Sequence, residues 1–264
     1  MLLKINFGQS PKRNTQDSAG YDVYADHKFI VKKGESYKWT LPFLIQGDKS
    51  AFIVVRSSLG IKKGLRLIDE DQKMNNEIKW SKPNKPLTLH LYNDGDEDLV
   101  VNIGDHIIQC IIPASVKSVI PIVWNKVQQK YLKGSIPILS RFEQRPKEIY
   151  DFILEESLHI PAKEKVLIPT GLRAWIPVQT YLTAYLTNEN LMFANVRPII
   201  DADYHNNIDN EGHIFLCVQN TSDTPITISQ GESLCYFEAN GYTLIKNEIK
   251  PVTKRAGGIG HTTK

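Results

Sequence analysis

Short runs in which apolar and polar residues alternate fill most of the chain, and turn residues separate them. Residues 51–55, 87–92 and 106–112 have the length and the β-branched and aromatic content of strands. Clusters such as Lys33-Gly34-Glu35 and Asn93-Asp94-Gly95 interrupt these runs, as turns do. No long stretch has the apolar spacing of an amphipathic helix. The pattern therefore predicts an all-β protein, a barrel or sandwich of mainly antiparallel strands.

Parts of this pattern occur twice at a constant spacing, which is the mark of an internal repeat. Asn93 is matched by Asn220, 127 residues later (220 − 93). Gly104 is matched by Gly231 at the same spacing (231 − 104). The alternation of apolar residues around these positions also recurs. The sequence therefore predicts two copies of one β-barrel or jelly-roll domain, fused in tandem.

The seam between the copies is expected within residues 114–134, where Pro113, Pro121 and a polar stretch interrupt the alternation. We therefore expect a first β domain over residues 1–133 and a second over residues 134–247. Residues 248–264 form a Gly-rich tail that we expect to be flexible, because glycine leaves the backbone conformationally free.

Charge and cysteine content narrow the choice of environment and partner. The 32 Lys and Arg residues nearly balance the 29 Asp and Glu residues, and no long basic run occurs, which argues against nucleic-acid and membrane-surface binding. Cys110, Cys217 and Cys235 lack the spacing of a metal site and suit buried free thiols in a reducing compartment. With neither a signal-peptide pattern nor a run of membrane-spanning length, we expect a cytoplasmic protein, or a nuclear one in a eukaryotic or viral setting.

The stretch Ile200-Asp201-Ala202-Asp203-Tyr204 is unusually polar for a strand that enters a turn. By itself it could be an ordinary half-exposed strand or part of a site. The first copy offers at most Asp69-Glu70-Asp71 in its place, without a tyrosine. Conversely, the first copy carries Arg56-Ser57-Ser58-Leu59-Gly60 near the place where the second copy has Leu186-Thr187-Asn188-Glu189-Asn190. Each copy carries polar groups that the other lacks.

Together these segments resemble the five signature motifs of the deoxyuridine triphosphate nucleotidohydrolases, the dUTPases. In the common homotrimeric members, motifs one, two and four, motif three and motif five come from three different subunits. One chain carries all five here, so the resemblance implies a monomer with one composite site. In motif order, the matching segments are Ser18-Ala19-Gly20-Tyr21-Asp22, Arg56-Ser57-Ser58-Leu59-Gly60, Ile200-Asp201-Ala202-Asp203-Tyr204, Gly104-Asp105-His106-Ile107-Ile108-Gln109 and Lys254-Arg255-Ala256-Gly257-Gly258-Ile259-Gly260-His261-Thr262.

The resemblance also implies an activity, the hydrolysis of dUTP to dUMP and pyrophosphate with Mg²⁺, through attack of water on the α-phosphorus. Asp201 would be the base that orients and deprotonates the water. Asp22 would hold Mg²⁺ through water. Tyr204 would pack against the deoxyribose, and Asn195 would pair with uracil. The remaining residues that this resemblance assigns to substrate binding are Arg56, Ser57, Ser58, Gln109, Arg255, Gly257, Gly258, Ile259 and His261.

Several residues depart from the family pattern. Asn206 stands where glycine is usual, at a turn that asparagine should tolerate because it adopts positive φ more readily than most residues. Ile259 stands where phenylalanine usually stacks on uracil, and His106 and Ile108 alter motif four. These departures keep open a catalytically weak relative that senses nucleotides or binds a protein. A dCTP deaminase relative shares the fold, but the segment from Asp201 to Tyr204 favours the hydrolase.

Overall fold

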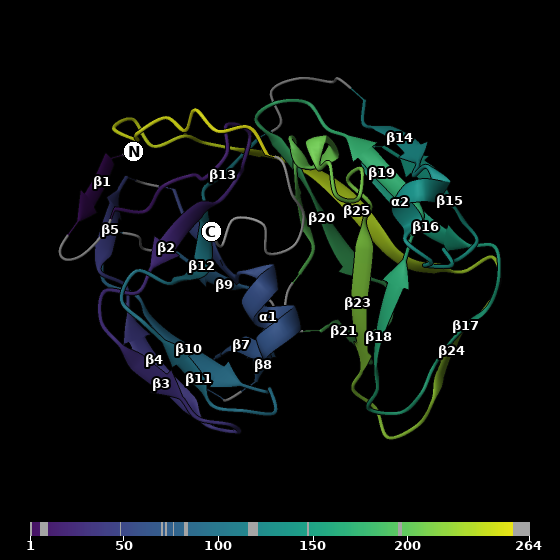
Figure 1. The fold of residues 1–264 in the computed structure, drawn as a ribbon, viewed down its shortest axis with the longest axis horizontal. Helices are drawn as coiled ribbons and strands as arrows, with labels where there is room; N and C mark the ends of the chain where they lie inside the picture. The colour runs from purple at the N-terminus through teal and green to yellow at the C-terminus, as the bar shows by residue number, and fades with distance from the viewer. Residues whose placement is uncertain are drawn as a thin grey trace.

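The structure, a computed structural model, describes residues 2–5, 10–47, 49–69, 71, 73–75, 77–81, 84–115, 121–146, 148–194 and 197–255, with only the backbone for residues 2–5. The regular secondary structure of the described chain is almost entirely β-strand. A first half, residues 2–115, and a second half, residues 121–242, lie side by side (Figure 1). Residues 243–255, here called the return segment, follow the last strand.

Among its described residues, the first half contains one short helix, α1 (Ser57–Lys63), and a series of short strands. Most of the strands pair with neighbours in small antiparallel sheets. The strands are β1 (Leu2–Ile5), β2 (Tyr21–Tyr24), β3 (Phe29–Val31), β4 (Ser36–Thr40), β5 (Phe43–Gln46), β6 (Ala51–Val55), β7 (Leu65–Ile68), β8 (Met74–Asn75), β9 (Ile78–Trp80), β10 (Thr88–Asn93), β11 (Leu99–Val101), β12 (His106–Ile111) and β13 (Pro113–Ala114).

The second half follows the same plan, with a short helix, α2 (Gln129–Leu132), and a 3₁₀ turn, η1 (Tyr204–Asn206). Its strands are β14 (Val123–Lys126), β15 (Ser140–Arg145), β16 (Ile149–Leu154), β17 (Leu158–Ile160), β18 (Lys165–Pro169), β19 (Leu172–Trp175), β20 (Thr180–Leu186), β21 (Leu191–Phe193), β22 (Ile199–Asp201), β23 (Phe215–Asn220), β24 (Ile226–Ile228) and β25 (Ser233–Tyr242).

Each half has its own hydrophobic core, which the alternating sequence pattern builds. Every second residue of β10 is buried, as the period of a strand requires, and β23 repeats this pattern. The first core includes Trp39 and Phe43, and the second includes Phe152 and Phe237. Burial of such large side chains is the main favourable contribution to folding. The prediction of an all-β fold with two tandem units is confirmed.

The two halves share their strand pairing, position by position. β2 pairs with β12 as β16 pairs with β25, and β12 pairs with β6 as β25 pairs with β20. β14 pairs with β19 in the second half as β1 pairs with β5 in the first. β14 is therefore the first strand of the second copy, although it lies before the boundary predicted after residue 133. Its neighbour Ile122 likewise belongs to the second core.

Register identifies the residue that stands in the place of Asp201 in the first copy. Trp80 is paired with Ala51 at the end of β9, and Ile200 is paired with Leu182 at the equivalent position of β22. The next residue is Ser81 in the first copy and Asp201 in the second. The expectation that Asp69-Glu70-Asp71 matches this segment is wrong, because Asp69 follows β7, an earlier strand than β9.

Polar and apolar contacts join the two halves. Arg66, which is only 1% exposed, donates to Gln219 of the second half at 2.7 Å and to Asp94 of its own half at 2.6 Å. Lys165 of the second half also contacts Asp94, at 3.0 Å. A small apolar cluster that includes Val54 and residues of the second half packs at the same boundary. Within the described part of the chain, no helix has both the length and the apolar character needed to span a membrane.

Candidate active site between the two halves

The polar strand end of the second half contacts the first half directly. Asp201 is the last residue of β22, where pairing with Tyr181 of β20 fixes its backbone. The backbone N–H of Ala19, in the first half, donates to Asp201 Oδ1 at 2.9 Å. Asp201 is 8% exposed and Asp203 only 3%. Both copies of the domain therefore hold the buried Asp201 carboxylate in place.

Arg255 of the return segment bridges the two carboxylates. Its Nε donates to Asp203 Oδ1 at 2.7 Å, and its Nη2 donates to Asp201 Oδ2. Its guanidinium carbon lies 5.6 Å from the centre of the Tyr204 ring, where a cation is attracted to the aromatic face. Tyr204 also donates its hydroxyl to the carbonyl of His213 at 3.3 Å. The sequence-predicted residues Asp201, Tyr204 and Arg255 therefore lie together.

Burial sets the protonation behaviour of this carboxylate pair. Burial raises the pKa of Asp201 to about 6, the charge of Arg255 opposes that rise, and the charge of Asp203 adds to it. Burial also disfavours the charged form of Arg255, but the charges of Asp201 and Asp203 outweigh it and raise the pKa of the guanidinium. At neutral pH the site therefore holds a carboxylate and a cation side by side.

A second polar cluster surrounds Asp22 on β2. Asp22 is 2% exposed and accepts hydrogen bonds from Gln109 Nε2 at 3.0 Å and from the Asn14 amide. Arg56 Nε lies 3.9 Å from Asp22 Oδ1, and His106 Nδ1 lies 3.7 Å from Oδ2. Burial raises the pKa of Asp22, and the charge of Arg56 opposes this rise. The sequence-predicted residues Asp22, Arg56 and Gln109 thus form one cluster, and Asn14 is an addition to it.

His106 is a neutral member of this cluster near pH 7. Burial lowers the pKa of its imidazole to about 4, and the nearby charge of Arg56 lowers it further. The charge of Arg255 also acts on Asp22, and the charge of Asp22 acts on Asp201. The charged groups of the two clusters are therefore close enough to influence one another's pKa values.

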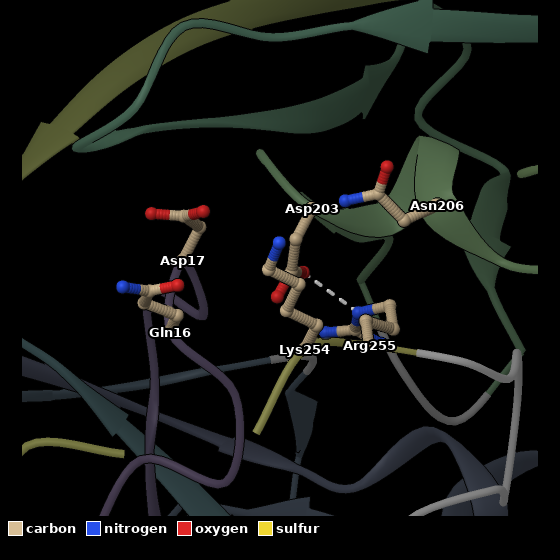
Figure 2. Close-up of a pocket in the computed structure, with 6 residues that line it drawn as sticks. All are labelled: Gln16, Asp17, Asp203, Asn206, Lys254 and Arg255. Carbon is tan, nitrogen blue, oxygen red and sulfur yellow. Dashed lines mark hydrogen bonds and ion pairs between the residues drawn. The ribbon is translucent and has the colours of Figure 1, made fainter. Parts of the chain in front are cut away.

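A pocket of about 500 Å³ opens beside the carboxylate pair. Figure 2 shows its walls, which come from three segments far apart in the sequence. The lining residues are Gln16 and Asp17 of the first half, Asp203 and Asn206 of the second half, and Lys254 and Arg255 of the return segment.

Sequence reasoning did not assign Gln16 or Asp17 to a site, and it placed Lys254 in the motif-five segment without a binding role. Asp17 directly precedes the motif-one segment and Lys254 directly precedes Arg255, so proximity to the motifs was the available signal. Burial raises the pKa of Asp17, and the charge of Asp203 across the pocket raises it further. The pocket therefore combines carboxylates with cations, a mixture suited to a ligand that carries both anionic and hydrogen-bonding groups.

The other predicted residues have different outcomes. Ser57 and Ser58 form the first turn of α1, directly after Arg56 and close to the end of β6. The expectation that Asn206 adopts positive φ is wrong, because Asn206 belongs to η1, and the left-handed residues of this region are Glu211 and Gly212. The predictions for Asn195, Gly257, Gly258, Ile259 and His261 lie outside the described residues.

Comparisons with known proteins agree on one family. The sequence pattern of the dUTPase family matches residues 7–131. The deoxyuridine 5'-triphosphate nucleotidohydrolase of Lactococcus lactis is 32% identical over 148 residues, which are 52% of this chain and 95% of that protein. The protein of the same name from Yarrowia lipolytica is 31% identical over 133 residues, or 47% of this chain and 78% of the relative.

One solved structure is similar over both halves. It is the 2'-deoxycytidine 5'-triphosphate deaminase of Agrobacterium tumefaciens, with a TM-score of 0.59 over 90% of this chain and 94% of that chain. The two sequences are 12% identical, so this likeness concerns the fold alone. The arrangement of two such β units within one chain therefore occurs in another protein.

Proposed function

Because this chain belongs to the dUTPase family, we propose that it hydrolyses dUTP to dUMP and pyrophosphate at a single composite site between its two halves. The observation that carries this proposal is the hydrogen bond from Ala19 to Asp201, 2.9 Å long. It joins the motif-one segment of the first half to the motif-three segment of the second. The parts of the site that the two copies retain separately are thereby in contact.

Asp201 is the base in this proposal. A pKa of about 6 leaves most of the carboxylate ionised at neutral pH, yet close enough to 7 to accept a proton from the attacking water. Arg255 holds Asp201 Oδ2 in the present structure. The triphosphate offers this arginine stronger bidentate partners, so substrate binding draws Arg255 from the carboxylates to phosphate oxygens and frees Asp201 for water.

The remaining residues bind and orient the nucleotide. Arg56 and Gln109 stand beside Asp22 and present N–H donors that suit phosphate oxygens. Ser57 and Ser58 supply hydroxyl and backbone donors next to Arg56. Tyr204 packs its ring against the deoxyribose. Outside the described residues, Asn195 pairs with uracil, and Gly257, Gly258, Ile259 and His261 cover the substrate.

Magnesium, which the family resemblance implies, suits the residues around Asp22. Among the described residues, no group of three or more His, Cys, Asp or Glu side chains could hold a metal by itself. Mg²⁺ keeps much of its water and often binds through one or two carboxylates together with substrate phosphates. Asp22 supplies one such carboxylate, in contact with the donors Gln109 and Asn14. The bound ion would neutralise phosphate charge, and Asp22 would hold it through water.

The test is one assay of purified protein with dUTP, dCTP or dTTP and Mg²⁺, following pyrophosphate and ammonia separately. We expect pyrophosphate from dUTP and little product from the other two nucleotides. Binding of a non-hydrolysable dUTP analogue without any pyrophosphate release would instead support a sensing module. Ammonia release from dCTP would assign the chain to the deaminases. Light scattering checks the accompanying expectation of a monomer, which a stable trimer would contradict.

A further inference from the structure

The return segment leaves the second half and packs onto the first. Thr243 N–H donates to the carbonyl of Ile112 at 2.8 Å, directly after β25. Ile245 then enters the first hydrophobic core with 2% of its surface exposed. Figure 1 shows this segment, in yellow, crossing from the second half to the first. The chain therefore approaches the candidate site from the side of the first half.

A buried ion pair fixes the segment there. Arg13 donates from Nε and Nη2 to the two oxygens of Glu248, at 3.0 and 2.8 Å. The two side chains are 5% and 6% exposed. Tyr21 donates its hydroxyl to Glu248, while the same hydroxyl oxygen accepts the N–H of Ile245 at 2.8 Å. Removing one partner from such a pair leaves the other charge buried and unpaired, which is costly.

This group, here called the Arg13 clamp and formed by Arg13, Tyr21 and Glu248, adjoins the pocket. Arg13 also donates from Nη1 to the carbonyl of Gln16 at 2.7 Å. Gln16 lines the pocket, and its N–H donates to the carbonyl of Thr253 at 3.1 Å. The same loop therefore forms one wall of the pocket and holds the backbone two residues before Arg255.

The clamp restricts the position of Arg255 because few residues separate the two. Glu248 precedes Arg255 by seven residues (255 − 248), which limits the reach of the arginine to about 25 Å even when the chain is extended. A group tethered so closely has a high effective concentration at its target. Without the clamp, the buried anchor before Arg255 would be Ile245, ten residues away (255 − 245), and Arg255 would sample a larger volume.

We propose that the Arg13 clamp is a positioning device for the C-terminal segment, and that it makes Arg255 serve the site of its own chain. Arg13, Tyr21 and Glu248 act through Arg255 and do not touch the substrate. Only the kinetic part of this inference, the change in KM for dUTP, rests on the proposed function. Docking of the return segment itself can be measured without a substrate.

The kinetic test compares Glu248→Gln, Arg13→Met and the double variant. If the clamp raises the population of the docked segment, each single variant should raise KM for dUTP about 10-fold while kcat changes by less than about 3-fold. The double variant should resemble the singles, because both changes break one interaction. An unchanged KM in soluble, folded variants, or strictly additive effects, would overturn the proposal. Asp151→Asn, which disrupts the more exposed 2.7 Å pair between Arg145 and Asp151, is the control for loss of an ion pair away from the pocket.

The docking test uses limited trypsin digestion after Lys254 and Arg255, with no nucleotide present. The Arg255 side chain is 13% exposed in the docked segment. The clamp variants should lose the C-terminal fragment about 10-fold faster, since cleavage follows the population of the open form. Equal rates in the wild type and the variants would overturn the clamp. A wild type that fails to release pyrophosphate would defeat the proposed function while leaving this result decisive. If the ion-pair variants do not fold, Tyr21→Phe keeps the ion pair, removes the two hydrogen bonds of the hydroxyl, and should give a smaller change in the same direction.

A mixing experiment tests the claim that the segment serves its own chain. Full-length Asp201→Asn and full-length Arg255→Ala are each expected to be impaired. If Arg255 acts only within its chain, the mixture should have the summed activity of its components. A gain above that sum would show that chains exchange this segment, which would overturn the proposal.

Discussion

Asn93 and Asn220 make the same contacts in the two halves, whereas Asp22 and Asp151, also equivalent by strand register, have different surroundings. The Asn93 amide donates to the carbonyls of Val31 and Glu97, each at 2.8 Å. The Asn220 amide donates to the carbonyls of Ile160 and Thr224, at 3.2 and 2.8 Å. Both asparagines are fully buried. Both halves therefore retain this buried hydrogen-bonding arrangement of the scaffold.

The polar residues of the candidate site, in contrast, do not recur with the same contacts in both halves. Asp22 is paired across strands with Gln109, and Asp151 with Tyr236 at the equivalent position. Tyr236 stacks on Tyr185 with ring centres 5.1 Å apart, and Asp151 forms an ion pair with Arg145 instead. Arg56 and Thr187 also hold equivalent places, because each donates its backbone N–H to the matching position of β12 or β25.

The difference follows from what each buried side chain holds in place. Losing a buried amide such as Asn93 or Asn220 leaves backbone carbonyls without partners, so either change would destabilise its own half. Asp22 and Asp201 are also buried, but they serve the candidate site, and such a residue can change in one copy once the other copy supplies the chemistry. The positions of Asp22 and Asp201 therefore diverged in opposite copies, with Asp151 and Ser81 as their counterparts.

The largest expected contrast is between Asp201 and Ser81. Asp201→Asn should lower kcat for dUTP about 10³-fold, because the amide cannot accept the proton of the attacking water. Ser81→Ala, at the equivalent exposed position, should leave kcat within about 2-fold, as a surface change does. Pyrophosphate release at saturating dUTP measures both. A similar effect of the two substitutions would remove the functional distinction between the copies.

A smaller contrast is expected between Asp22 and Asp151. Asp22→Asn should lower kcat/KM about 10- to 100-fold at limiting Mg²⁺, since it weakens the hold on the metal-bound substrate. Asp151→Asn should have no such effect, because its partner is Arg145. Titration of activity against Mg²⁺ tests this. Equal dependence on Mg²⁺ in both variants would argue against a site at Asp22.

The scaffold asparagines should show the opposite behaviour, a matched effect. Asn93→Ala and Asn220→Ala should each lower the free energy of unfolding by about 3 kcal/mol, because each leaves buried backbone groups unpaired. Urea denaturation followed by fluorescence measures the loss. The exposed Asn125 supplies the control substitution, Asn125→Ala. A loss confined to one half would show that the two scaffolds are not energetically equivalent.

The smallest expected effect is a displacement of the pH profile. The pKa of Asp201 is raised from 3.8 to about 6, mainly by burial, so kcat/KM should fall as pH drops below about 6. Since the folded protein binds this proton more tightly than the unfolded chain does, the contribution of Asp201 to stability should decrease as pH rises through the same window. Asp203→Asn should move the activity limb to lower pH, and Arg255→Ala to higher pH. Asp223→Asn, at an exposed position, is the control and should leave the profile unchanged. A profile that shifts with neither Asp203→Asn nor Arg255→Ala would contradict Asp201 as the titrating group.

Much of the fold could be predicted because it depends on local pattern. Alternation specifies strands, and the recurrence of Asn93 and Gly104 at Asn220 and Gly231 reveals the duplication. The match proposed for Asp201 failed because similarity of composition does not report register. Only the pairing of Trp80 with Ala51 shows that Ser81 holds that place.

The site was predictable only where its residues lie within motifs. The partners Arg13 and Glu248 are 235 positions apart, and nothing local in the sequence marks either of them. Asp17 enters the pocket through the path of its loop. The backbone conformation of Asn206 was likewise not predictable: the sequence suggested positive φ, but Asn206 lies in the 3₁₀ turn η1, which does not need it.

The return segment also bears on how the fusion persists over generations. Ile245, which follows the last strand of the second half, belongs to the first core, while β13 of the first half extends the sheet that contains β25. Loss of either copy would expose apolar surface on the survivor, even if the lost copy contributed no catalytic group. Selection for folding alone would then retain both copies, so the duplication is difficult to reverse once the two cores share residues.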